Sequence, residues 1–195
     1  EHGILLVFDE VICGFGRLGA PFASHAFGVT PDLMTMAKAL TNGAQPMGAV
    51  AVDDHVYKTI TEAAPENAIE FFHGYTYSGH PAACAAGIAV QKIYEEEQSF
   101  DKAASLSDYF LDGLFSLRDL DVVKDIRGYG LMGGVELHPK GTPGALGTQT
   151  QKDLFWNGMH VKFTGDVGIL APPFASEKEH IDEMIDKLRM TFEAI

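Results

Sequence analysis

The chain has few basic residues and no long apolar run. Of its 195 residues only 14 are Lys or Arg, against 27 Asp or Glu, so the formal net charge is −13. This balance argues against nucleic acid as a partner, because binding to a phosphate backbone depends on Lys and Arg that displace counterions. No apolar stretch approaches the roughly 20 residues of a membrane span. We therefore expect a soluble protein with neither a membrane nor a nucleic-acid partner.

Cysteine is equally sparse. Neither Cys13 nor Cys84 stands in a CxxC or Cys/His spacing, and the eight histidines form no HExxH motif, so we expect no metal site. So few cysteines suit a reducing compartment. The start Glu-His-Gly-Ile lacks the basic region of a signal peptide. Together these absences predict a cytoplasmic protein.

What the chain does have is apolar content, at 46% of its residues, which supports a packed core and excludes a disordered chain. Its first residue is Glu1 rather than Met, and a strand-like apolar run begins directly after Gly3. This abrupt start predicts a fragment of a longer protein.

Hydrophobic patterning divides the chain into an α/β part, residues 1–98, and an α+β part, residues 99–195. Residues 4–8 are continuously apolar, which is typical of a strand buried on both faces of a parallel sheet. Residues 99–104 are the best linker candidate. The other expected elements are strands at 31–36 and 47–52, a helix at 53–63 capped by Asp53, a strand or loop at 71–78, a helix from Pro81 to about residue 98, an amphipathic helix after residue 104, a bent strand or hairpin at 122–137, a short helix capped by Thr148 or Thr150, strands at 159–163 and 167–170, and a last helix capped by Ser176.

Residues 14–19 read GFGRLG and match the GxGxxG pattern of dinucleotide-binding proteins. In those proteins the motif opens a helix at once, and an acidic residue ends a strand about 20 residues later. Here Gly19 is followed by Ala-Pro-Phe, and no such acidic residue follows. The pattern therefore favours glycines that shape a loop beside a site, while an NAD-dependent enzyme stays as the weaker alternative.

Asp9 and Lys38 each stand where an apolar strand gives way to a loop. The carboxyl ends of parallel strands meet at one edge of a sheet, so the two side chains are expected at one crevice. Such a pair is compatible with catalysis, but a structural salt bridge gives the same pattern.

Three segments resemble the class III pyridoxal-phosphate-dependent aminotransferases. They are LVFDEVICGFGRLG at 6–19, PDLMTMAKALTNG at 31–43 and HGYTYSGHP at 73–81. The chain is most similar to the branch of ω-amino acid (β-alanine):pyruvate aminotransferases, along essentially its whole length. The resemblance implies the α/β fold of PLP-dependent transferases, fold type I (aspartate aminotransferase-like). Residues 1–98 would be the C-terminal part of the PLP-binding large domain, and residues 99–195 the α+β C-terminal small domain.

By this resemblance, Lys38 looks like the lysine that forms an imine with the cofactor aldehyde and later moves the substrate proton. Asp9 looks like the carboxylate that keeps the pyridine nitrogen protonated. Val11, expected on the same strand face as Asp9, resembles the apolar residue on the flat face of the ring. Thr76 matches the threonine that reaches the phosphate of the neighbouring subunit's cofactor, which implies a homodimer or homotetramer.

Lys162 stands where this branch usually carries an arginine that binds the substrate carboxylate. A lysine is a point charge and cannot form the two parallel hydrogen bonds of a guanidinium, so the affinity for a carboxylate is expected to differ. Without the resemblance, Val11 would be core, Thr76 a strand threonine and Lys162 a surface lysine.

The resemblance implies transfer of an amino group from an ω-amino acid such as β-alanine, or from an amine, to pyruvate, giving alanine. Donors such as 4-aminobutyrate, ornithine or polyamines are alternatives, because sibling branches share Asp9 and Lys38. A non-catalytic remnant that keeps only the fold is another. Family members carry a phosphate cup and early sheet strands in a preceding region, so we expect the fragment alone to hold the cofactor poorly and to leave a strand edge unpaired.

Overall fold

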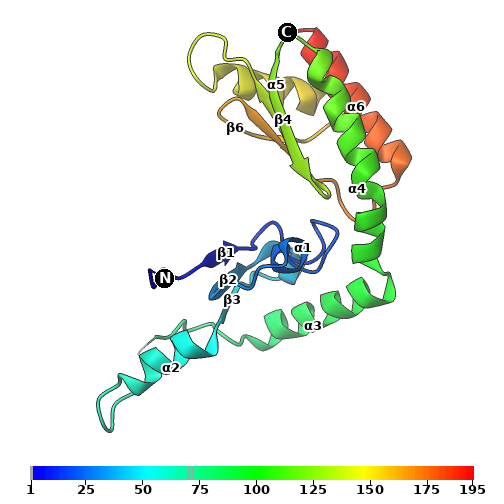
Figure 1. The fold of residues 1–195 in the computed structure, drawn as a ribbon. Helices are drawn as coiled ribbons and strands as arrows, with labels where there is room; N and C mark the ends of the chain where they lie inside the picture. The colour runs from blue at the N-terminus through cyan, green and yellow to red at the C-terminus, as the bar shows by residue number, and fades with distance from the viewer. Residues whose placement is uncertain (1, 70, 72) are drawn as a thin grey trace. The chain divides into compact units, whose positions relative to one another are not determined.

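A computed structural model describes residues 2–69, 71 and 73–195, and these form two compact units (Figure 1). The first unit contains the residues up to Phe15 together with Ala20–Gln98. The second contains Ser99–Ile195 and the short segment Gly16–Gly19. The predicted division between residues 98 and 99 placed Gly16–Gly19 in the first part of the chain. The structure instead groups this segment with the second unit. No helix within the described residues is long and apolar enough to span a membrane.

The first unit is built on a three-stranded sheet in the order β1-β2-β3. Strand β1 (Val7–Asp9) pairs in parallel with β2 (Leu33–Met36), which pairs antiparallel with β3 (Ala49–Val52). The expected parallel relation between the first two strands is therefore confirmed. The helices of this unit are α1 (Ala23–Phe27), the one-turn 3-10 helix η1 (Lys38–Leu40), α2 (Asp54–Glu62) and α3 (Pro81–Glu96).

Local sequence signals set the starts of α2 and α3. The carboxylate of Asp53 accepts a hydrogen bond from the backbone N–H of His55 at 2.9 Å, as expected of an N-cap. The same N–H and the imidazole of His55 hold the pKa of Asp53 below its usual range. Pro81 occupies the first position of α3, where its missing N–H has no partner to lose.

The prediction of a strand at 4–8 buried on both faces is wrong for the described chain. The ladder with β2 covers only Val7–Asp9, and Ile4 and Val7 are 83% and 55% exposed. The reason is the position of β1 at the edge of the described three-stranded sheet, where it pairs with β2 alone. A strand with a continuous apolar run is expected to be covered on both faces. In the described chain, only part of the surface of this strand is covered.

The second unit is a four-stranded antiparallel sheet with helices packed on one face. The sheet order is β4-β5-β7-β6. Its elements are α4 (Ser99–Phe115), η2 (Ser116–Asp119), β4 (Val123–Tyr129), β5 (Met132–Leu137), α5 (Ala145–Trp156), β6 (Lys162–Thr164), β7 (Val167–Leu170) and α6 (Lys178–Glu193). The expected hairpin at 122–137 is confirmed as β4 and β5.

The core of this unit lies between the sheet and helices α4 and α6. Phe110 and Leu114 of α4, Val135 of β5, and Ile181 and Leu188 of α6 are almost fully buried. Each such side chain contributes roughly 1.5–3 kcal/mol through burial. This cluster fixes the strands of the sheet against the two helices.

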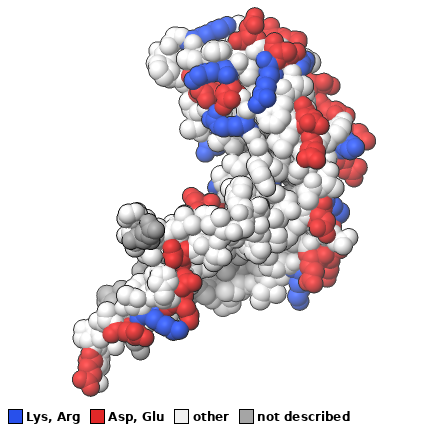
Figure 2. Space-filling view, viewed as in Figure 1, with Lys and Arg blue, Asp and Glu red and all other residues white. Residues whose placement is uncertain are grey.

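The opposite face of the sheet is charged. Glu136 accepts hydrogen bonds from Lys124 at 2.6 Å and from Arg127 at 3.2 Å, and these two cations lower the pKa of its carboxyl. Arg127 also donates to Asp125 at 2.7 Å, and the two carboxylates raise the pKa of its guanidinium. Basic and acidic side chains are interleaved on the face of this unit shown in Figure 2.

Several predicted boundaries in this unit are wrong. The proposed linker at 99–104 is instead the start of α4, because Ser99, Ala103 and Leu106 continue its buried face. Helix α5 begins before both Thr148 and Thr150. The N–H groups of its N-cap residue, Gly144, and of its third residue, Gly147, donate to the carboxylate of Asp166, each at 2.9 Å.

The last helix is capped one residue later than predicted. Glu177, not Ser176, is its N-cap residue. His180 completes a capping box, because its Nδ1 accepts the backbone N–H of Glu177 at 3.0 Å.

Candidate active site

The parallel pairing of β1 and β2 places Asp9 and Lys38 beyond the same edge of the sheet. Asp9 is the last residue of β1 and lies opposite Thr35 of β2. Lys38 follows the end of β2 and begins η1. Both side chains are exposed, and within the described residues no ion pair joins Lys38 to Asp9 or to any other carboxylate. A structural salt bridge, the other interpretation of this pair, is therefore not what the structure forms.

Two hydrogen bonds orient the carboxylate of Asp9. Its Oδ1 accepts the backbone N–H of Val11 at 3.1 Å and the hydroxyl of Thr35 at 3.2 Å. With Oδ1 bound in this way, Oδ2 is the oxygen that can accept a hydrogen bond from a bound molecule. Thr35 was not among the residues predicted from the sequence, although a polar residue inside the apolar strand LMTM is a usable signal.

Lys38 is held in an uncommon backbone conformation. Its φ is +45°, in the left-handed region that side chains other than glycine rarely adopt. The turn is secured from α3, where the hydroxyl of Tyr94 donates to the carbonyl of Ala39 at 2.8 Å and Gln91 donates to the carbonyl of Leu40 at 3.4 Å. Strain of this kind is retained where the surrounding structure fixes the backbone, and it is common at functional sites.

The loop after β1 is organised by Glu10, which sequence analysis missed. This side chain is 1% exposed, and its carboxylate accepts the N–H groups of Ala23 at 3.0 Å and Ser24 at 3.1 Å. Helix α1 therefore begins only at Ala23, with its N-terminal donors already bound. A dinucleotide pyrophosphate would require such N–H groups directly after the glycine motif. The motif thus serves loop packing rather than NAD binding.

The remaining predicted residues lie on different elements. Val11 is half-buried and begins the turn after β1, so the expectation that it shares a strand face with Asp9 is wrong. The strand ends at Asp9, where the bond from the Val11 N–H starts the turn. Thr76 is exposed in a turn that precedes α3. Lys162 is the exposed first residue of β6 in the second unit and pairs with Ile169.

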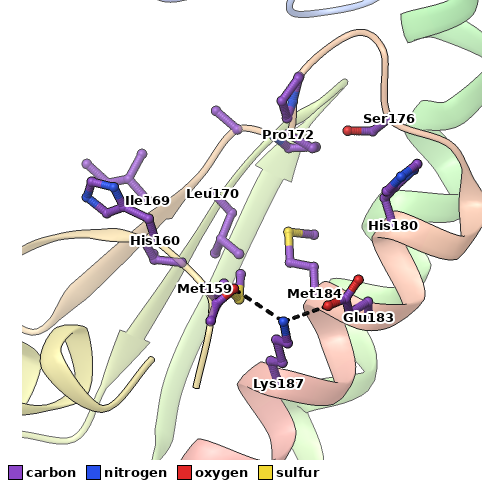
Figure 3. Close-up of a pocket in the computed structure, with 14 residues that line it drawn as sticks. Met159, His160, Ile169, Leu170, Pro172, Ser176, His180, Glu183, Met184 and Lys187 are labelled. Carbon is purple, nitrogen blue, oxygen red and sulfur yellow. Dashed lines mark hydrogen bonds and ion pairs between the residues drawn. The ribbon is translucent and has the colours of Figure 1, made fainter. Parts of the chain in front are cut away.

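A separate cavity of about 380 Å³ lies within the second unit, between β7 and α6 (Figure 3). Met159, Leu170 and Met184 form its apolar wall. At its edge, the ammonium of Lys187 donates to Glu183 at 2.6 Å, which lowers the pKa of that carboxyl, and to the carbonyl of Gly158 at 3.2 Å. None of the site residues predicted from the sequence lines this cavity.

Metal ligands are not gathered in either unit. Among the described residues, no group of three or more His, Cys, Asp or Glu side chains is placed to hold a metal ion. The polar groups that stand out in the first unit are instead a carboxylate, a hydroxyl and an amine at the edge of one sheet.

Comparison with known proteins defines the class to which this fold belongs. The family model for class-III aminotransferases matches residues 1–192. The chain belongs to this family. Its fold is the α/β fold of the ω-transaminases, fold type I of the PLP-dependent enzymes, of which it contains a part.

Its relatives include the omega-aminotransferase of Caulobacter vibrioides, 50% identical over 97% of this chain and 43% of the relative. The beta-alanine–pyruvate aminotransferase of Pseudomonas aeruginosa is 44% identical over 95% of this chain and 42% of the relative. A solved omega transaminase from Pseudomonas jessenii in complex with PMP superimposes with a TM-score of 0.89 at 31% identity, covering 98% of this chain and 44% of that protein. The chain thus spans less than half the length of these relatives.

Proposed function

We propose that the complete protein is an aminotransferase that uses pyridoxal 5'-phosphate to move an amino group from an ω-amino acid, such as β-alanine, or from an amine, to pyruvate, giving alanine. The family and the relatives named for ω-amino acids and pyruvate support this assignment. The observation that carries it is the placement of Asp9, with its carboxylate oriented by Thr35, and of Lys38 at one edge of the sheet.

The residues present fit this cofactor. Pyridoxal phosphate, when bound, supplies an aldehyde that reacts with amines and a pyridine ring that withdraws electrons from the bonds to the amine carbon. Lys38 offers an exposed primary amine, and Asp9 offers a carboxylate with Oδ2 available. Val11, beside Asp9, would pack against the ring.

Lys38 has two tasks in this proposal. Its Nζ would hold the cofactor through the aldehyde carbon, whose oxygen would leave as water, until a substrate amine displaces the lysine. The released amine would act as a general base and acid for the proton on the substrate carbon. Asp9 would accept a hydrogen bond from the ring nitrogen, and its negative charge would favour the protonated ring.

Two further residues would bind the charged ends of the ligands. The hydroxyl of Thr76 would donate to a phosphate oxygen in the neighbouring subunit, which requires a homodimer or a homotetramer. Lys162 would bind the substrate carboxylate as a single point charge, where an arginine would form two parallel hydrogen bonds. We place the enzyme in the cytoplasm, because its sparse cysteines suit a reducing compartment.

The test is borohydride reduction of the full-length enzyme loaded with cofactor, followed by peptide mapping. We expect the cofactor to be fixed on Lys38, and a label on another lysine would overturn the assignment. The visible absorbance should shift when β-alanine is added and return with pyruvate. Asp9→Asn should keep the label on Lys38 but slow both half-reactions, because it leaves attachment intact and removes the charge beside the ring.

A second donor class has support among the relatives. Gamma aminobutyrate transaminase 2 of Solanum lycopersicum is 39% identical over 95% of this chain and 42% of its own length. Rates measured with β-alanine, 4-aminobutyrate, ornithine and a polyamine at equal pyruvate would rank these donors. A fully labelled enzyme that transfers no amino group would instead indicate a remnant that keeps only the fold.

A further inference from the structure

The glycine loop, residues 14–19, is divided between the units: Gly14 and Phe15 are grouped with the first, and Gly16–Gly19 with the second. At its base in the first unit, the N–H of Phe15 donates to the carbonyl of Pro21 at 2.7 Å, and the rings of Phe15 and Phe22 meet edge to face at 5.1 Å. The segment Gly16–Gly19 belongs to the second unit. Contacts among residues of the first unit thus close the base of the loop. The proposed function assigns no role to the tip of the loop, Gly16–Gly19.

Arg17, at this tip, is bound on several sides. Its Nη1 donates to the carbonyl of Leu131 at 3.2 Å and to that of Pro172 at 2.5 Å. The guanidinium lies 4.7 Å from the centre of the Phe174 ring. Its own carbonyl accepts the N–H of Leu131 at 2.9 Å.

The glycines explain how the tip fits so closely. A side chain at Gly16 would collide with the ring of Phe100. One at Gly130, in the hairpin turn, would lie 2.5 Å from the Cα of Leu18. The tip therefore packs backbone against backbone at the hairpin turn, which holds Arg17 in register with its acceptors.

The carbonyls that Arg17 binds flank the two central strands of the sheet, β5 and β7. Leu131 immediately precedes β5, and Pro172 follows the end of β7. These strands pair at this end of the sheet, where Gly134 lies opposite Ile169. On its other side, Ile169 pairs with Lys162 of the edge strand β6. Arg17 thus bridges the chain before β5 and the chain after β7, the strand against which Lys162 of β6 pairs.

We propose that Arg17 is a positioning residue for Lys162. By bridging β5 and β7, its guanidinium fixes the strand against which Lys162 pairs, and so sets where the ammonium meets the substrate carboxylate. A lysine cannot reproduce this arrangement, because an ammonium has neither the planar fork nor the stacking surface of a guanidinium. The inference rests on the proposed role of Lys162 in substrate binding.

The test compares Arg17→Lys and Arg17→Met in the full-length holoenzyme. We expect the KM for pyruvate to rise about tenfold, the scale of one lost charge-assisted hydrogen bond, while kcat changes by less than about twofold. The KM for benzylamine, a donor without a carboxylate, and the absorbance of the bound cofactor should not change. In hydrogen–deuterium exchange, the peptide covering 162–170 should exchange faster.

Arg118 provides a matched control. Its Nη2 donates to the carbonyl of Ile126 at 3.1 Å, and its guanidinium lies 4.4 Å from the ring of Phe115, so it makes the same kinds of contact elsewhere in the second unit. Arg118→Met should lower the unfolding temperature without changing either KM. If the Arg17 variants behave like Arg118→Met, Arg17 is merely structural and the inference is wrong. Where Arg17→Met fails to fold, Arg17→Lys decides by the same criteria.

Lys162→Met separates this inference from the proposed function. If that variant leaves the KM for pyruvate unchanged, the proposed role of Lys162 fails, and this inference fails with it. If Lys162→Met raises the KM but Arg17→Lys does not, only the inference about Arg17 fails. In the double variant Arg17→Lys/Lys162→Met, the effect of Arg17 should disappear, because the group that it positions is gone. Fully additive effects would contradict the inference.

Discussion

The hydroxyl of Thr35 donates a hydrogen bond to the carboxylate of Asp9 across the paired strands β1 and β2, at 3.2 Å. This bond, with that from the N–H of Val11, holds one carboxylate oxygen and leaves the other to accept. The orientation of the proposed catalytic carboxylate therefore depends on a side chain of the neighbouring strand.

Thr35→Val should lower kcat roughly tenfold, the scale of one lost hydrogen bond to a charged group. Valine has nearly the same shape, so the fold should persist. Steady-state kinetics with the full-length enzyme measure the effect, and Thr35→Ser, which keeps the hydroxyl, should restore most of kcat. Equal losses in the valine and serine variants would contradict a role for the hydrogen bond.

Glu10 and Asp9 are adjacent acidic residues with different roles. Glu10 is buried and caps a helix, whereas Asp9 is exposed at the proposed site. Glu10→Ala leaves the N–H groups of Ala23 and Ser24 without their acceptor and should destabilise the protein by about 1–3 kcal/mol. Glu10→Gln keeps one acceptor oxygen and should lose less. Thermal unfolding measures both variants. Asp9→Asn is the comparison, since it should lower activity with little change in unfolding temperature.

The sequence indicated Asp9 and Lys38 because their positions follow from local features, apolar strands that end in polar residues. Pro81 and Asp53 marked helix starts for the same reason. Glu10 could not be recognised as a cap in this way, since its partners lie 13 and 14 residues away. A cap from another part of the chain is invisible to any pattern of neighbouring residues.

The same limit explains the misplaced start of α5, which is capped by Asp166, 22 residues after Gly144. The assignment of 99–104 as a linker failed for a different reason. Ser99 and Ala103 are small and only weakly hydrophobic, yet they continue the buried face of α4. Burial of small residues depends on what approaches them, which the sequence of the helix alone does not reveal.

The left-handed backbone at Lys38 allows the effect of backbone strain on stability to be measured separately from the effect of the amine on catalysis. Lys38→Ala and Lys38→Gly should both abolish amino transfer, because each removes the amine. Glycine adopts a φ of +45° without penalty, so Lys38→Gly should be more stable than Lys38→Ala by about 1 kcal/mol. Denaturant unfolding of the two variants measures the difference. The opposite order would show that the backbone relaxes once the lysine is removed.

Glu136 gives a pH dependence whose sign follows from its partners. Lys124 and Arg127 lower its pKa in the folded protein, so its ion pairs stabilise the fold above the pKa of the unfolded carboxyl. That stability is lost as the pH falls through the lowered folded value. Glu136→Gln should therefore be less stable than the wild type at pH 7, and the difference should vanish in acid. Thermal unfolding across this range tests it, with the exposed Glu66→Gln as control.

Lys162 offers a gain-of-function prediction. Lys162→Arg places a planar guanidinium at the first position of β6, where two parallel hydrogen bonds to a carboxylate become available. The KM for pyruvate should fall severalfold, while the KM for benzylamine, which has no carboxylate, should stay the same. Lys152→Arg, an exposed change on α5 in the same unit, is the control for added surface arginine. A lower KM for both pyruvate and benzylamine, or for neither, would place the carboxylate contact on a residue other than Lys162.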